Sequence, residues 1–243
     1  MANLIIDIGN TYAKLALFEG DVLLNLCKEG KSFPKGFSQI AQGVEIKSAI
    51  VSSVIDLAPE TSTFIESLPF PVLYLKPTTP LPIRIGYKSV SSLGVDRIAA
   101  VTAAKENYPG QNILIIDAGT AITYDFLSSE GEFLGGNITP GKQMRFEILH
   151  SRAPRLPLID ENGEKPLTGY DTTTAIRGGV MKSIAYEMNG YIQDYQKIYP
   201  DLNVILTGGD AQLFEGELEK EHILEPHLVL KGLNRILHYN EIH

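Results

Sequence analysis

The fold of this chain of 243 residues can be inferred from two similar stretches, Asp7-Ile8-Gly9-Asn10-Thr11 and Asp117-Ala118-Gly119-Thr120. Each follows a short apolar run, Leu4-Ile5-Ile6 in the first case and Asn112 to Ile116 in the second. Each is also followed by a second run in which apolar residues recur, so both read as two buried strands joined by a polar turn. The two aspartates are 110 residues apart. The chain therefore contains an internal duplication of a strand, turn and strand.

The repeat continues beyond the second strand. An acidic turn with a central glycine follows in each copy, Glu19-Gly20-Asp21 in one and Glu130-Gly131-Glu132 in the other, and a third apolar segment comes next. Between the two copies lies Tyr108-Pro109-Gly110, whose Pro-Gly pair is typical of a turn or loop. We expect two domains, residues 1–110 and residues 111–243.

Helices and strands alternate in the rest of the chain. Strands are predicted for residues 48–54, 72–75 and 203–206, and helices for residues 59–68 and 174–197. A further helix is expected from Leu93 onward, with Asp96 in its first turn, and Gly208-Gly209 is expected to open a last helix. Such alternation indicates the α/β class.

The residues of the two turns suit phosphate binding. An aspartate at the carboxyl end of a strand can hold a hydrated divalent cation, and glycine lets the backbone approach phosphate oxygens. Threonine and asparagine add hydrogen-bond donors, so two such turns facing each other would clamp a nucleoside triphosphate. The alternative is that both are ordinary turns, because Asp, Gly, Asn and Thr are common turn residues. Duplication at matched strand ends favours the phosphate-binding interpretation.

A third turn, Thr207-Gly208-Gly209-Asp210, lies between a predicted strand and a predicted helix. Backbone amides at a helix start can contact an anionic ligand. The alternative is a tight connection without a ligand.

Composition limits the partners. Lys and Arg number 21 against 29 Asp and Glu, a formal charge of −8 that disfavours nucleic acid. No apolar run reaches the ~18 residues of a membrane helix, and the first residues show no secretory leader, so we expect no membrane partner. The single cysteine, Cys27, fits a reducing compartment, which predicts a cytoplasmic protein, and we interpret it as a buried small apolar residue.

The ordered set of motifs resembles the type III pantothenate kinases, which belong to the superfamily of acetate and sugar kinases, heat-shock chaperones and actin. The resemblance rests on both aspartate turns, the third glycine turn and a set of segments between and after them. These are Tyr87, Leu93-Gly94-Val95-Asp96-Arg97, Gly135-Gly136-Asn137-Ile138-Thr139-Pro140-Gly141, Asp171-Thr172 and Leu228-Val229-Leu230-Lys231-Gly232-Leu233. It implies an α/β fold of two duplicated ribonuclease H-like, actin-like ATPase domains, with an interdomain cleft that closes over ATP.

The same resemblance implies a reaction, the ATP-dependent phosphorylation of pantothenate to 4'-phosphopantothenate, which is the first step of coenzyme A biosynthesis. It implies ATP binding by Asp7, Ile8, Gly9, Asn10, Thr11, Tyr12, Ala13, Lys14 and Thr120. It implies pantothenate binding by Tyr87, Gly94, Val95, Asp96, Arg97 and Thr172. Asp96 would be the proton acceptor, and Asp117 would bind a monovalent cation, K⁺ or NH4⁺, in addition to the Mg²⁺ that accompanies ATP. A homodimer is also expected.

The chemistry of the Asp96-Arg97 pair agrees with those roles. An aspartate can orient a hydroxyl and take its proton late in a loose transition state, and an arginine can bind a carboxylate or phosphate through two parallel hydrogen bonds. The alternative is a helix-start aspartate beside an ordinary surface arginine. One departure from the family lies just before Gly94, where residues 88–92 read Lys-Ser-Val-Ser-Ser and lack the Asn-Pro of many members.

Other functions remain open from the sequence. They are a kinase for another small hydroxyl or carboxylate acceptor, a non-catalytic accessory or regulatory protein on the same scaffold, and an actin-like filament or chaperone. Two further groups are interpreted structurally. Tyr186, Tyr191, Tyr195 and Tyr199 predict a packed helix face that a dimer could use, and Arg145, Arg152 and Arg155 are expected on a solvated surface.

Overall fold

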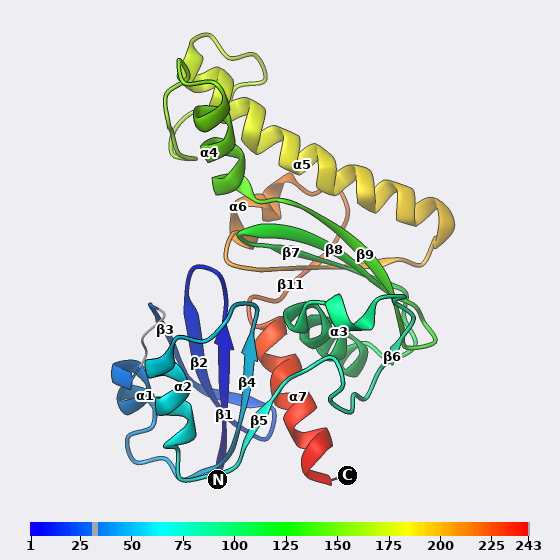
Figure 1. Cartoon of the computed structure of the whole chain (residues 1–243). Helices are drawn as coiled ribbons and strands as arrows, with labels where there is room; N and C mark the ends of the chain where they lie inside the picture. Colours follow the sequence, from blue (N-terminus) through cyan, green and yellow to red (C-terminus); the bar gives the residue numbers. More distant parts are fainter. Residues whose placement is uncertain (31–33, 243) are drawn as a thin grey trace. The chain divides into compact units, whose positions relative to one another are not determined.

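The computed structural model describes residues 1–30 and 34–242 (Figure 1). Its contacts divide the chain into two compact units. Unit 1 comprises residues 1–109, 131–133 and 227–243, and unit 2 comprises residues 110–130 and 134–226. The predicted domains, 1–110 and 111–243, stay a prediction. The contact units differ from them chiefly by grouping residues 227–243 with the first unit.

Unit 1 contains a mixed five-stranded sheet in the order β3-β2-β1-β4-β5. β1 is antiparallel to β2, which is antiparallel to β3, whereas β1, β4 and β5 run parallel. The strands are β1 (Ala2–Ile8), β2 (Ala13–Glu19), β3 (Val22–Glu29), β4 (Ile46–Ser53) and β5 (Val72–Tyr74). The helices are α1 (Pro34–Ile40), α2 (Pro59–Glu66), α3 (Val95–Asn107) and α7 (Leu228–Ile242), with a 3₁₀ turn η1 at Val90–Ser92. The predicted helix from Leu93 is thus found as α3.

Both faces of this sheet are buried, which explains the continuous apolar run in β1. Leu4, Ile6 and Ile8 belong to the core cluster that includes Phe37 and Phe64 near α1 and α2. The alternate residues of β1 point to the other face of the sheet. There Asn3 donates a hydrogen bond to Asn234 of α7 at 3.1 Å. Asp7 shares that second face.

The segment 227–243 belongs to unit 1 because α7 packs closely along α3. A Cβ built on Gly232 would lie 1.8 Å from the carbonyl oxygen of Ala99, so only glycine allows this approach of the two helices. Residue 95 and residues 97–104 of α3 are buried. Ser48 and Lys47 of β4 add hydrogen bonds to Glu241 near the end of α7.

Unit 2 repeats the strand order of unit 1. Its sheet runs β11-β10-β7-β8-β9, in which β7 is antiparallel to β8 and parallel to β10, and β10 is parallel to β11. The strands are β7 (Ile113–Ala118), β8 (Ala121–Leu127), β9 (Glu132–Pro140), β10 (Asn203–Thr207) and β11 (Ile223–Leu224). The helices are α4 (Lys142–Arg152), α5 (Thr172–Ile198) and α6 (Ala211–Phe214), followed by a 3₁₀ turn η2 at Glu215–Glu217. β6 (Arg84–Ile85) pairs in parallel with Glu132 and Phe133 at the start of β9. The matching order confirms the predicted duplication.

The expectation that Gly208-Gly209 opens the last helix is wrong. The helix that follows, α6, has four residues, and the last helix is α7. α6 ends where Glu215, Gly216 and Glu217 form a 3₁₀ turn, because two exposed acids and a glycine favour no continuing apolar face.

Three of the four tyrosines in and just after α5 pack inside unit 2. Tyr191 stacks on Tyr124 of β8 with ring centroids 4.1 Å apart, and Tyr195 and Tyr199 stack on Phe126 at 4.9 and 4.5 Å. A packed face was expected. Because these three rings are used within the chain, they leave only the exposed Tyr186 of this set for a partner.

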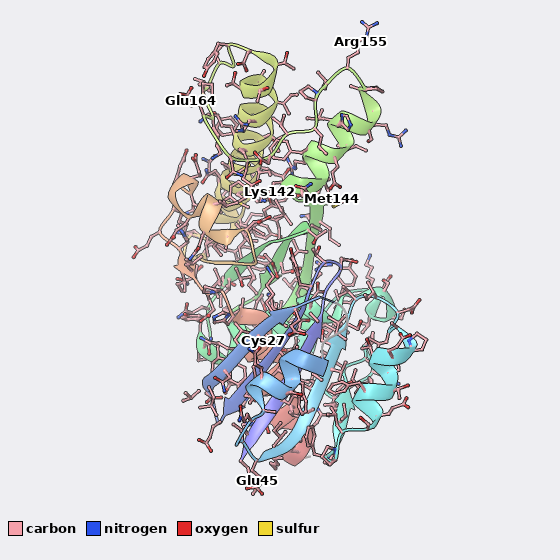
Figure 2. The ribbon with its side chains drawn as sticks, turned by 90° about the vertical axis from the view of Figure 1, so that its left-hand side faces the viewer. Cys27, Glu45, Lys142, Met144, Arg155 and Glu164 are labelled. Carbon is pink, nitrogen blue, oxygen red and sulfur yellow. The ribbon has the colours of Figure 1, made fainter. Side chains whose placement is uncertain are left out.

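Cys27 lies half-buried on β3, against the core of unit 1, rather than fully buried as expected (Figure 2). The strand is at the edge of its sheet, so one side of the thiol remains near solvent. In the described ranges, no helix combines the length and the apolar composition needed to cross a membrane.

Candidate active site

The first aspartate turn joins β1 to β2. The Gly9 amide donates to the Tyr12 carbonyl at 3.0 Å and closes the turn, while Asn10, Thr11 and Tyr12 are exposed. Ile8 and Ala13 are buried in the core, so only their backbone groups can serve a ligand in this turn. The turn therefore offers a short arc of backbone amides and hydroxyls at the end of the sheet.

Asp7 and Lys14 face each other across the strands that flank this turn. Asp7 is half-buried, and the pKa of its carboxyl group is raised from 3.8 to about 6. Burial is the largest cause, the Lys14 ammonium opposes it, and the nearby Asp96 carboxylate adds to it. Unit 1 thus brings together two carboxylates and a lysine from residues 7, 14 and 96.

Asp96 lies in the first turn of α3, as the sequence predicts. Its Oδ1 accepts a hydrogen bond from the Arg97 amide at 2.8 Å, which holds the carboxylate at the helix start. A Cβ on Gly94 would lie 2.5 Å from the same oxygen. Gly94 is therefore needed where it is because any side chain there would displace the Asp96 carboxylate.

Arg97 is not the ordinary surface arginine of the alternative interpretation. It is 5% exposed, and its guanidinium lies 5.7 Å from the ring centres of both Tyr87 and Phe133. Those two rings stack on each other with centroids 6.4 Å apart. Aromatic faces stabilise a cation and fix a planar guanidinium, so Arg97 is held in one orientation.

Phe133 is a site residue that the sequence motifs do not reveal. It stands in β9, 36 residues after Arg97, and its only sequence signal is an apolar position in an alternating strand. Its role follows from the pairing of β6 with the start of β9, which carries residues 84–87 and Phe133 to the same place.

The second aspartate turn has the same local geometry as the first. The Gly119 amide donates to the Ala121 carbonyl at 3.0 Å. Asp117 faces Thr123 across β8 and Thr207 in β10, and no lysine stands where Lys14 stands in the first copy. The two turns are therefore alike in backbone and different in charge.

Three turns converge in unit 2 around residues 117–120. Gly208 has a φ of +101°, and a Cβ there would lie 2.2 Å from the Ala118 carbonyl oxygen and 2.5 Å from Asp117 Oδ1. The Asp210 amide donates to the Ala118 carbonyl at 2.9 Å. On the other side, a Cβ on Gly141 would lie 2.1 Å from the Gly119 carbonyl oxygen. Glycine is required at both positions, so these glycines pack turns against one another.

Lys142 links these turns and is a second residue that the motifs do not reveal (Figure 2). Its side chain is 11% exposed, and Nζ lies 2.8 Å from Glu161 Oε1 and 3.6 Å from Asp210 Oδ1. Burial alone would lower the pKa of Lys142, but the two carboxylates raise it. The ion pairs tie the third glycine turn to the segment that leads to Thr172.

Thr172 is the first residue of α5 and is exposed. Asp171 caps this helix, because its carboxylate accepts from the Thr174 amide at 2.7 Å and the Thr174 hydroxyl lies 3.1 Å from the Asp171 amide. Thr172 belongs to unit 2, whereas Tyr87, Gly94, Val95, Asp96 and Arg97 belong to unit 1.

The expectation of a solvated surface is wrong for Arg145. Its Nη2 donates to Glu187 Oε2 at 2.8 Å, and its Nε donates to the Pro140 carbonyl at 2.8 Å. Glu187 also accepts from the hydroxyls of the fully buried Tyr124 and of Thr139, both at 2.7 Å. This network joins β8, β9, α4 and α5. Arg152 and Arg155 are exposed as expected, and Arg155 extends away from the chain (Figure 2).

The oxygen donors fit hard cations. Asp7 and Asp117 each stand beside backbone carbonyls and hydroxyls at a strand end, which are ligands that Mg²⁺ and K⁺ accept. Within residues 1–30 and 34–242 no group of three or more His, Cys, Asp or Glu side chains forms a metal cluster. A cation here would thus be shared with a ligand or with carbonyl oxygens.

Comparisons with known proteins identify the fold and the family of this chain. The two units repeat one strand order, and this duplicated fold is that of the sugar kinases and actin-like ATPases. Over residues 3–194 the chain matches the family model of the type III pantothenate kinase. It is 47% identical to a type III pantothenate kinase of Bacteroides fragilis, with 98% of each chain covered, and 44% identical to one of Phocaeicola vulgatus, with 98% and 99% covered. The chain belongs to the type III pantothenate kinase family.

Solved structures share the fold at low identity. The activator of the 2-hydroxyisocaproyl-CoA dehydratase from Clostridium difficile, with bound ADPNP, has a TM-score of 0.56 at 14% identity, covering 100% of this chain and 98% of that one. A ROK family glucokinase from Streptomyces griseus, in complex with glucose and AMPPNP, has a TM-score of 0.53 at 10% identity, covering 97% and 99%. These confirm the predicted α/β class and the duplicated fold.

Proposed function

We propose that this chain transfers the γ-phosphoryl group of ATP to the primary hydroxyl of pantothenate, forming 4'-phosphopantothenate in the first step of coenzyme A biosynthesis. Family membership supports this reaction. The observation that carries it is the placement of Asp96. This carboxylate stands at the start of α3 beside the aromatic-clamped Arg97 and interacts with Asp7 of the first phosphate turn, all within unit 1.

The phosphates of ATP are bound by the first turn, Asp7 to Lys14, and by Thr120 of the second. The Lys14 ammonium balances phosphate charge, and the exposed Asn10 and Thr11 side chains supply donors. Asp7 would hold Mg²⁺, and the ion would neutralise charge on the phosphates. A bound cation would also ionise Asp7 fully, because a positive charge lowers a carboxyl pKa.

Asp96 orients the acceptor hydroxyl and accepts its proton as the new oxygen-phosphorus bond forms and the bond to ADP breaks. Arg97 binds the pantothenate carboxylate through paired hydrogen bonds. Tyr87 and Phe133 keep its guanidinium plane fixed, so the acceptor is positioned without a rearrangement of the arginine. Gly94, Val95 and Thr172 complete the pantothenate site in this proposal.

Asp117 is the proposed ligand for K⁺ or NH4⁺. The absence of a lysine opposite Asp117 supports a cation there, since in the first turn Lys14 already supplies the positive charge. The homodimer and the cytoplasmic location stay predictions. Sedimentation velocity of the purified chain tests the first, and cell fractionation tests the second.

A coupled assay that follows ADP release tests the reaction. The chain is offered ATP and Mg²⁺ with pantothenate, acetate or common sugars, each with and without K⁺. We expect turnover with pantothenate alone. Turnover with a sugar or acetate would instead identify a kinase for another acceptor, and ATP binding without any turnover would identify an accessory protein.

A further inference from the structure

A cavity of about 500 Å³ opens in unit 1 away from the proposed pantothenate site. It lies between residues 81–84, the last turn of α3 and α7. Its wall carries Arg84, Lys105 and Arg235, one carboxylate from Glu106, the ring of Tyr239 and the apolar segment Leu81-Pro82-Ile83. Asp96 is nine residues before Lys105 on α3, so ~1.5 Å of rise per residue separates the two along the helix by ~13 Å.

The charge of this cavity is opposite to that of the protein. Three cationic side chains line it against a single carboxylate, whereas the whole chain has a formal charge of −8. A concave surface of one sign focuses the local potential and attracts small ions of the opposite sign. The cavity is therefore suited to an anion.

Arg235 is held at the wall of the cavity by an ion pair, in which its Nη2 lies 3.0 Å from Glu106 Oε1. Lys105 is held at the wall by a hydrogen bond from its Nζ to the Pro82 carbonyl, which uses one of three ammonium donors.

We propose that this cavity binds a small phosphomonoester. Arg235 and Lys105 donate to the phosphate oxygens, and Arg84 at the exposed rim adds a third positive charge. Guanidinium groups bind phosphate through charge-assisted hydrogen bonds. The volume exceeds that of phosphate alone, and the apolar segment 81–83 with the Tyr239 ring accommodates the organic part of the ligand. This site is separate from the proposed reaction and does not depend on it.

Phenyl phosphate is the probe, because it joins a dianionic phosphate to a small apolar ring. Its binding to the full chain is measured by isothermal titration calorimetry at pH 8, with saturating ADP and pantothenate to fill the other sites. We expect saturable binding that Arg235→Gln weakens at least ~10-fold, as expected for loss of a charge-assisted hydrogen bond. Phenol, which lacks the phosphate, should not bind.

Glu106→Gln is the matched variant that should change the affinity for phenyl phosphate in the opposite direction. It removes the carboxylate that competes for Arg235, so binding of phenyl phosphate should tighten severalfold, a result that a damaged fold cannot produce. Arg152→Gln, an exposed arginine on α4, should change nothing. Absence of saturable binding, or equal affinity in the wild type, Arg235→Gln and Glu106→Gln, overturns the proposal. Pantothenate turnover measured on the same preparations reports on the proposed reaction separately.

Discussion

Replacement of Asp7 by asparagine should make the protein more stable and remove its activity. Burial, together with the Asp96 carboxylate, raises the pKa of Asp7 from 3.8 to about 6, so the folded state binds the proton more tightly than the unfolded chain does. Because the Asp7 carboxyl group is ionised at neutral pH, its burial lowers the free energy of unfolding there. Asparagine has nearly the same shape and no charge, so it relieves that cost.

The size of the effect follows from the two pKa values. A shift of roughly 2 pH units at about 1.4 kcal/mol each sets a ceiling of about 3 kcal/mol for the gain at pH 8. Below the unfolded pKa both states are protonated and the cost vanishes; it grows as the pH rises and is complete above the folded pKa. Integration of the linkage relation reduces the gain to about 1 kcal/mol at pH 4.5.

Urea unfolding of the wild type and Asp7→Asn, followed by far-ultraviolet circular dichroism at pH 8 and pH 4.5, measures this difference. Asp21→Asn, at an exposed aspartate in the next turn, is the control and should alter stability by less than ~0.5 kcal/mol. The reasoning is refuted if Asp7→Asn is no more stable than the wild type at pH 8, or if its advantage is the same at both pH values. The ADP-release assay on the same variant should show no transfer at ordinary Mg²⁺ and ATP concentrations.

Three further substitutions probe the rest of the site. Asp96→Asn should fold and bind ATP but lose at least ~100-fold in rate, the scale of a positioned acid-base group, and near-normal turnover would exclude Asp96 as proton acceptor. At fixed ionic strength and Mg²⁺, activity should be high in potassium or ammonium chloride and low in sodium chloride, and Asp117→Ala should abolish the difference; equal wild-type activity in all three salts argues against a monovalent site. Lys142→Met should cost ~1–3 kcal/mol at pH 7, because it leaves Glu161 and Asp210 facing each other without a cation. Lys142 lowers the pKa of Glu161 below its ordinary 4.5, so that stabilisation is present at neutral pH and is lost as the pH falls from 4.5 through the folded pKa. An effect that does not shrink in acid would contradict the ion-pair account.

The local structure of the site could be predicted because it depends on residues that are contiguous in the sequence. The aspartate, glycine and threonine of each turn follow an apolar strand, and Gly94 and Asp96 mark the start of α3. These signals depend on backbone preferences within a few residues. Strand order could also be inferred in outline, since a duplicated unit builds its sheet in the same way twice.

What could not be predicted depends on contacts between distant parts of the chain. Phe133 joins Arg97 only because β6 pairs with the start of β9. Lys142 meets Glu161, which lies 19 positions later, beyond α4 and part of the irregular segment that follows it. Arg145 looks like a surface residue in the sequence, but its partner Glu187 lies 42 positions away on α5. Neither strand pairing nor ion pairing at such separations leaves a periodic signal in one sequence.

The close crossing of Gly232 and Ala99 has a consequence for synthesis on the ribosome. The first unit includes residues 227–243, which emerge only after the whole of unit 2 has been made. Until then α3 lacks the helix that buries it, and its apolar residues are left without their partner. Unit 2 is complete once residue 226 has been made, so it can form its core before unit 1, although its residues come later in the gene than most of unit 1. Domains usually fold in the order in which they are synthesised, beginning at the amino terminus. In this chain the unit that carries Asp7 and Asp96 completes its fold only after α7 has been made.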